Sequence, residues 1–122
     1  NNKEGSCLFH CADGKDRCGV GTALLLSLLG MDKEEIIKDY LLTNIFTKEK
    51  ANYQTSYLRD ICKIKNETLI NSVGILAGVR ENFIRAAFDY IDKNYNGIDS
   101  YLHNEMQFTD ERIKDRRDNY LE

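Results

Sequence analysis

Cys11 and Arg17 are the two side chains in this sequence whose types and spacing are best suited to chemistry. Five residues separate them, and Gly14 in that short polar segment lets the backbone turn tightly. A thiolate is a good nucleophile, and backbone N–H groups that converge at a helix N-terminus stabilise its charge. The same N–H groups can hold the oxygens of a tetrahedral anion, and a planar guanidinium can bind two of them at once. The pattern predicts a phosphate-binding loop in which Cys11 attacks phosphorus and Arg17 clamps the phosphate.

The other residues of this loop have separate predicted roles. Asp16 is a candidate proton donor, since a leaving alkoxide needs a proton. His10 and Cys18 flank the loop; we expect His10 to support it by hydrogen bonds and Cys18 by packing, with a redox partnership between Cys18 and Cys11 as the alternative. The charged loop residues could instead be solvated side chains without a role. The residues expected to contact the substrate phosphate are Ala12, Asp13, Gly14, Lys15, Asp16 and Arg17.

These residues need elements that position them. The run Ser6–Phe9 predicts a buried strand that leads into the loop. The apolar segment Gly19–Leu29 predicts a helix at the centre of the domain, which Gly30 ends. A lone strand is not stable, so this one is expected to need sheet partners from a missing N-terminal part or from another chain.

The rest of the sequence predicts further helices. Asp32 is expected to cap one whose inner face carries Tyr40, and a separate helix is expected over Thr47–Lys65. Glu67–Gly78 contains two glycines and predicts a loop with at most a short helical turn. The remaining helices are expected over Arg80–Lys93, near Ile98–Leu102 and after the capping residue Thr109.

The composition is that of one ordinary globular unit. The chain has 122 residues, 42% of them hydrophobic, and a net charge of -3, which gives no broad attraction to nucleic acid or anionic membranes. No apolar run approaches the roughly 20 residues that a membrane helix needs, and no signal peptide opens the sequence. Its four cysteines are too few and too clustered for a disulfide framework and lack the paired spacing of zinc sites. A cytoplasmic or secreted setting is expected, without a metal.

The loop and its surroundings resemble a known family. His-Cys-x5-Arg is the signature loop of protein tyrosine phosphatases, and the form His-Cys-x-x-Gly-Lys-Asp-Arg, at residues 10–17, is similar to the bacterial branch that includes secreted mycobacterial and listerial phosphatases. The resemblance continues through Gly19-Val20, and then at Asp39–Asn44, Val79–Ile91 and Asp99–Leu102. It therefore spans most of the chain.

The resemblance implies an α/β, cysteine-phosphatase-like fold, of which residues 1–122 form the mostly α-helical C-terminal part of a single catalytic domain with the catalytic-loop strand. It implies hydrolysis of phosphate monoesters on phosphotyrosine proteins through a phosphocysteine intermediate, without a cofactor. Phosphoinositide hydrolysis, in which Lys15 would bind additional phosphates, is an alternative within the family. Cys18 stands where the family usually has threonine or serine, so a phosphate-binding module without turnover is the alternative outside catalysis. Tyr40 and Asn44 match the family pattern and are expected to brace the loop.

Overall fold

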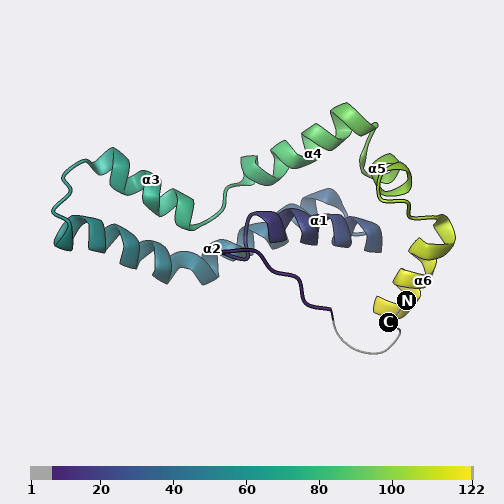
Figure 1. The fold of residues 1–122 in the computed structure, drawn as a ribbon, viewed down its shortest axis with the longest axis horizontal. Coiled ribbons are helices and arrows are strands. Elements are labelled where there is room, and N and C mark those ends of the chain that lie inside the picture. Colours follow the sequence, from purple (N-terminus) through teal and green to yellow (C-terminus); the bar gives the residue numbers. More distant parts are fainter. Residues whose placement is uncertain (1–6, 122) are drawn as a thin grey trace.

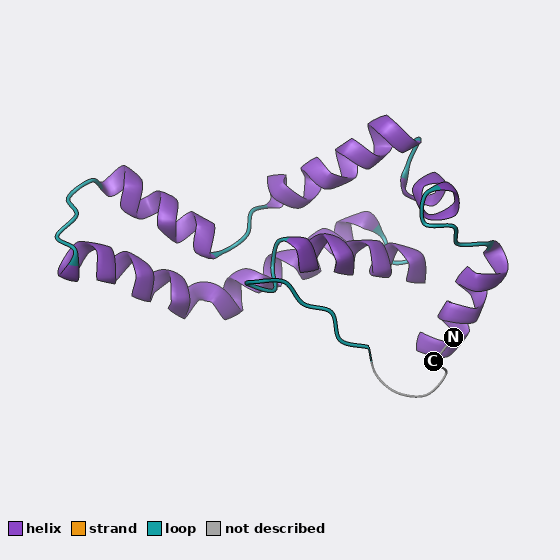
Figure 2. Cartoon of the chain, in the orientation of Figure 1, coloured by secondary structure: helices purple, strands orange, loops and turns teal. Residues whose placement is uncertain are grey.

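The computed structural model describes residues 7–121, and every regular element in that range is helical (Figures 1 and 2). The mostly α-helical character expected from the sequence is confirmed. No strand occurs among the described residues: the expected strand is irregular at Cys7–Phe9, and Ser6 lies outside them. The elements are α1 (Arg17–Leu29), α2 (Lys33–Ser56), a π-helical turn η1 (Tyr57–Ile61), α3 (Glu67–Ala77), α4 (Glu81–Tyr95), α5 (Ile98–Asn104) and α6 (Asp110–Tyr120).

Helix α1 is the central element, as its apolar sequence predicts. It contacts α2, α4, α5 and α6, and Figure 1 shows it in the middle of the fold, although only Ala23 and Leu28 on it are buried. Gly30 ends it in the left-handed conformation, with a φ of 92°, and the guanidinium of Arg117 on α6 donates to the carbonyl oxygen of Leu28 at 3.0 Å. The buried core around α1 consists of Ala23, Ile36, Ile37, Tyr40, Val79, Ile84 and Phe88.

Helices α1 and α2 pack closely at Gly19. A Cβ atom at this position would lie 2.6 Å from the ring of Tyr40, which is 8% exposed. Only glycine therefore fits beneath the ring without a shift of one helix. Because Gly19 lies two residues after Arg17, this contact fixes the start of α1, and with it the loop, against α2.

Helix α2 differs from the expectation. The sequence predicts two helices separated before Thr47, whereas the structure has one helix of 24 residues, about 36 Å long. No glycine or proline interrupts this stretch, and the Thr47 hydroxyl donates to the carbonyl oxygen of Thr43 at 3.0 Å, which satisfies that hydroxyl inside the helix. The Asp32 cap is confirmed: its carboxylate accepts from the N–H of Glu34 at 2.9 Å.

The loop predicted over Glu67–Gly78 is wrong, because this segment forms helix α3. Asn66 caps it by accepting from the N–H of Leu69 at 3.1 Å, and Ile70 is fully buried. Gly74 does not break the helix; a Cβ atom there would lie 3.2 Å from the Thr55 methyl group, so glycine permits close packing on α2. Helices α2 and α3 form a hairpin that extends away from the other helices (Figure 1).

The segment between α3 and α4 is held by Asn44 of α2. Its amide donates to the carbonyl oxygen of Val79 at 3.1 Å and accepts from the N–H of Val79 at 2.8 Å. A Cβ atom on the neighbouring Gly78 would lie 2.5 Å from the Asn44 side-chain oxygen. Asn44 therefore fastens the start of α4 to α2, and the expectation that it braces the catalytic loop is wrong.

The C-terminal third follows the sequence closely. Helix α4 buries Ile84, Phe88 and Ile91, and Asn96 ends it in the left-handed conformation. Thr109 caps α6 by accepting from the N–H of Arg112 at 3.3 Å. Within residues 7–121, none of the helices has the length and apolar character needed to cross a bilayer.

Candidate active site

The sulfur of Cys11 lies at the centre of a ring of hydrogen-bond donors. The N–H of Gly14 lies 3.2 Å from it, and Gly14 adopts a φ of 71°, which turns the loop back toward Cys11. The N–H groups of Cys18 and Asp13 also donate to the sulfur. Together these donors lower the pKa of Cys11 from 9.0 to about 6, with the N–H of Cys18 as the largest cause and partial burial opposing it. Cys11 is therefore largely a thiolate at neutral pH.

Cys18 lies beside Cys11 in the first turn of α1. Its thiol is hydrogen-bonded to Cys11, and its pKa is raised, first by burial and then by this contact with the neighbouring sulfur. Cys18 therefore stays protonated and can donate its S–H to the thiolate. Sequence reasoning placed Cys18 next to the site but did not give this direct contact.

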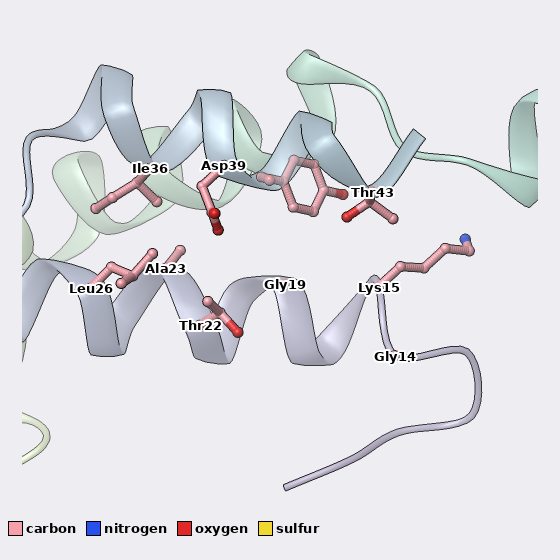
Figure 3. Close-up of a pocket in the computed structure, with 10 residues that line it drawn as sticks. Gly14, Lys15, Gly19, Thr22, Ala23, Leu26, Ile36, Asp39 and Thr43 are labelled. Atoms are coloured by element: carbon pink, nitrogen blue, oxygen red, sulfur yellow. The ribbon is translucent and has the colours of Figure 1, made fainter. Parts of the chain in front are cut away.

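Lys15 and Asp16 form an ion pair at the base of the loop. The ammonium nitrogen of Lys15 lies 3.2 and 3.3 Å from the two Asp16 carboxylate oxygens. The Lys15 side chain is only 7% exposed, whereas that of Asp16 is 60% exposed. Figure 3 shows Lys15 running along α2 beside Thr43, at one end of a cavity of about 90 Å³ between α1 and α2. The only charged side chain that is buried among the described residues is thus in the loop.

Asp13 forms an ion pair with a lysine from a distant part of the sequence. Its Oδ1 atom accepts from Lys50 Nζ at 2.8 Å, and Lys50 belongs to the outer half of α2. This hydrogen bond is the main reason that the pKa of Asp13 is lowered. The two side chains are 47% and 45% exposed, so the pair lies at the surface of the loop. Sequence reasoning missed Lys50, since it lies 37 positions from Asp13 in the sequence and no local pattern links the two.

Arg17 opens α1 and is exposed. Beside the loop, Arg17 borders an open and mainly apolar hollow. The other walls of this hollow come from α1, α2 and α4. An aromatic or aliphatic group attached to a phosphate could occupy this hollow. Sequence reasoning did not single out Phe83, which stands in the first turn of α4 at 40% exposure. The residues that line the hollow are Asp16, Arg17, Val20, Tyr40, Phe83 and Ile84.

The residues around the loop are placed as follows. His10 is exposed, with Nδ1 3.4 Å from the carbonyl oxygen of Cys11, and Ala12 is exposed in the loop. Tyr40 packs against Gly19. The pKa of Tyr40 is raised, mainly by burial and to a smaller extent by the negative charge of Asp16. Tyr40 was expected to brace the loop, and its contact is with Gly19 in the first turn of α1, directly after the loop.

Comparison with known proteins decides the family. The sequence model of a family described as "Tyrosine phosphatase family" matches residues 1–122, the whole chain. The chain belongs to this family. The triple specificity protein phosphatase PtpB of Mycobacterium tuberculosis is 33% identical over 104 residues, which cover 78% of this chain and 37% of that protein.

Two further relatives agree with the family. A protein of Cupriavidus necator, named as a candidate tyrosine-protein phosphatase, is 29% identical over 100 residues, covering 82% of this chain and 35% of that protein. A tyrosine-protein phosphatase of Nostoc commune is 46% identical over 41 residues, covering 34% of this chain and 14% of that protein. The chain spans little more than a third of the length of the first two relatives.

Proposed function

We propose that the protein carrying this chain hydrolyses phosphate monoesters through a phosphocysteine intermediate, with Cys11 as the nucleophile. The observation that supports this best is the ring of N–H donors around the Cys11 sulfur, which lowers the pKa of Cys11 to about 6. A thiolate stabilised in this way at a helix N-terminus is both a nucleophile and the floor of an anion site. Family membership supports the same reaction.

The two chemical steps use different loop residues. In the first, the Cys11 sulfur attacks phosphorus and the bond from phosphorus to the leaving oxygen breaks, and Asp16, in its protonated form and released from Lys15, gives that oxygen its proton. Arg17 and the loop N–H groups hold the phosphoryl oxygens, and His10 supports the loop. In the second, Asp16, now a carboxylate, takes a proton from the water that attacks phosphorus, the bond from phosphorus to sulfur breaks, and the sulfur leaves as a thiolate, toward which Cys18 donates its S–H. The exposed Asp16 carboxylate, at 60%, supports its access to a substrate.

Phosphotyrosine in a protein is the substrate class that we propose first. The hollow beside Arg17 has the apolar walls that an aromatic ring requires, with Phe83 and Tyr40 among them. Phosphoinositides are the second candidate, because the mycobacterial relative carries "triple specificity" in its name, which points to more than one kind of substrate. The burial of Lys15 in its pair with Asp16 means that a role in binding additional phosphates would require this pair to open.

We also propose that residues 1–122 are the C-terminal part of one catalytic domain. The length of the relatives supports this, as do Leu8 and Phe9, which are 89% and 50% exposed although apolar. Pairing of Cys7–Phe9 with strands from the rest of the protein, or from another chain, would bury them and would form the catalytic-loop strand.

Hydrolysis of p-nitrophenyl phosphate by the full-length protein tests the reaction. The Cys11→Ser variant should lose turnover but still bind orthovanadate, because the N–H groups and Arg17 remain. The Arg17→Lys variant should lose both, since lysine lacks the planar two-point grip. Turnover by Cys11→Ser at a rate near that of the native protein would rule out the covalent mechanism. A native protein that binds orthovanadate without any turnover would be a phosphate-binding module instead.

A panel of phosphopeptides and phosphoinositides then separates the substrate classes. We expect phosphotyrosine peptides to give the highest kcat/KM, and Phe83→Ala to reduce it for these peptides more than for phosphoserine peptides. A preference for phosphoinositides would favour the second candidate.

A further inference from the structure

The candidate phosphate loop contains an excess of negative charge. Asp13 and Asp16 lie beside Cys11, which is itself largely anionic at neutral pH, whereas Lys15 and Arg17 are the only cations within the loop. A phosphate monoester carries between one and two negative charges near neutral pH, so a nearby carboxylate without a counter-charge repels it. The loop therefore needs a further positive charge to bind its ligand well.

The two carboxylates obtain their counter-charges from different places. Asp16 pairs with Lys15 inside the loop, at 3.2 Å. Asp13 pairs with Lys50 of α2, at 2.8 Å, and this contact exists only because α2 continues as one helix past the loop. The N–H of Asp13 also donates to the Cys11 sulfur, so the segment that Lys50 holds is part of the ring of donors around the nucleophile.

We propose that Lys50 is a positioning residue for the substrate phosphate, which acts through Asp13 by neutralising its carboxylate. The inference rests on the proposed phosphatase function and adds to it a residue from outside the family's signature loop. Lys50 reaches Asp13 from the outer half of α2. Lys15 is buried and paired with Asp16, so Lys50 is the closer counter-charge for Asp13. The coupling makes binding of the anion depend on where α2 lies.

A purely structural role for the pair predicts a different result. Both side chains are nearly half exposed, and solvent screens ion pairs of this kind so strongly that they stabilise a fold little. Loss of Lys50 should therefore leave the unfolding transition almost unchanged. Its effect should appear in the binding of anionic ligands, because an uncompensated carboxylate then belongs to the loop that binds the phosphate.

The experiment compares variants of the full-length protein with p-nitrophenyl phosphate as the substrate. Lys50→Gln should raise KM about three- to tenfold and change kcat by less than about twofold, since a remote charge acts mainly on binding. Lys50→Arg should keep a KM near that of the native protein. Adding Asp13→Asn to Lys50→Gln should restore KM, because the amide needs no counter-charge.

The matched control is Lys48→Gln, which removes the same charge from the same helix at an exposed position. It should keep the native KM, and added salt should shrink the defect of Lys50→Gln by screening the exposed carboxylate. The inference is overturned if Lys50→Gln behaves like Lys48→Gln. It is also overturned if the double variant is no better than Lys50→Gln, since Lys50 would then not act through Asp13.

Orthovanadate affinity, measured by calorimetry on the same proteins, separates this inference from the proposed function. If the native protein binds orthovanadate without hydrolysing any ester, and Lys50→Gln weakens that binding while the double variant restores it, the role of Lys50 stands and the proposed function fails. If the native protein hydrolyses the ester but Lys50→Gln changes neither KM nor orthovanadate affinity, the proposed function stands and the role of Lys50 fails.

Discussion

Cys11 carries the charge on which both proposed chemical steps depend, and its ionisation can be measured directly. Its pKa is lowered to about 6, so the thiolate should predominate above that pH and the thiol below it. Alkylation by iodoacetamide should therefore accelerate through about pH 6 and level off above about pH 7, whereas an ordinary thiol keeps accelerating past about pH 8.5. Mass spectrometry of the Cys11 peptide gives the profile, and the same peptide in the urea-unfolded protein serves as the reference. A folded-state profile that matches the unfolded one would contradict the arrangement of donors.

The family resemblance implies threonine or serine at the position of Cys18, and the contact of Cys18 with Cys11 gives this difference a kinetic meaning. A thiol donates more weakly than a hydroxyl, so the phosphocysteine should break down slowly. Cys18→Thr should raise the steady-state rate about three- to tenfold, a part of the roughly 10²–10³ that a well-placed donor supplies.

Stopped-flow kinetics checks this expectation. A rapid burst in the native protein should shrink in the Cys18→Thr variant, because the second step would then no longer be the slower one. An unchanged or lower rate for the variant would mean that Cys18 only packs against its neighbour.

Among the elements, the α3–α4 junction depends on a single side chain. Asn44→Ala removes both hydrogen bonds to Val79, a residue that is 4% exposed and whose backbone groups would lose their partners. We expect a loss of about 2–3 kcal/mol in the free energy of unfolding, measured by urea denaturation. The exposed Asn52 on the same helix provides the control, and Asn52→Ala should cost much less. Equal losses for the two variants would show that the junction is not held in this way.

The sequence predicted the parts of the structure that depend on near neighbours. The loop from Cys11 to Arg17 and the ends of helices at Gly30, Asp32 and Thr109 are local, since the groups that satisfy one another lie within a few residues. Gly74 was misleading, because glycine can permit close packing on Thr55 as well as break a helix.

Contacts between distant segments could not be predicted from one sequence. The burial of Lys15 and the pairing of Asp13 with Lys50 both depend on where α2 lies, and no spacing rule gives that position. The strand expected at Ser6–Phe9 is not formed at Cys7–Phe9 for a related reason, since a strand forms only where a partner offers its backbone groups.

For the whole molecule, the exposed apolar residues predict that residues 1–122 alone are a weaker enzyme than the full-length protein. Leu8, Phe46 and Leu76 are largely exposed, at 89%, 83% and 66%. The isolated segment should bind a hydrophobic dye such as ANS more strongly and hydrolyse p-nitrophenyl phosphate at least about tenfold more slowly, because a frayed Cys7–Phe9 segment leaves the nucleophile poorly positioned. Matched concentrations of the two proteins are compared in one assay. Equal activity would mean that the loop needs no support from the rest of the protein.

The start of α1 has a thermodynamic consequence. Asp16 occupies the capping position but makes no capping hydrogen bond, because its carboxylate faces Lys15. An oxyanion held in the loop would supply the missing cap, so ligand and fold become linked equilibria. Phosphate, sulfate or vanadate in the buffer should then raise the midpoint of thermal unfolding in proportion to the logarithm of its concentration above Kd. The midpoint of thermal unfolding would thus depend partly on the anions in the buffer, and it would report the fraction of loops that hold an anion.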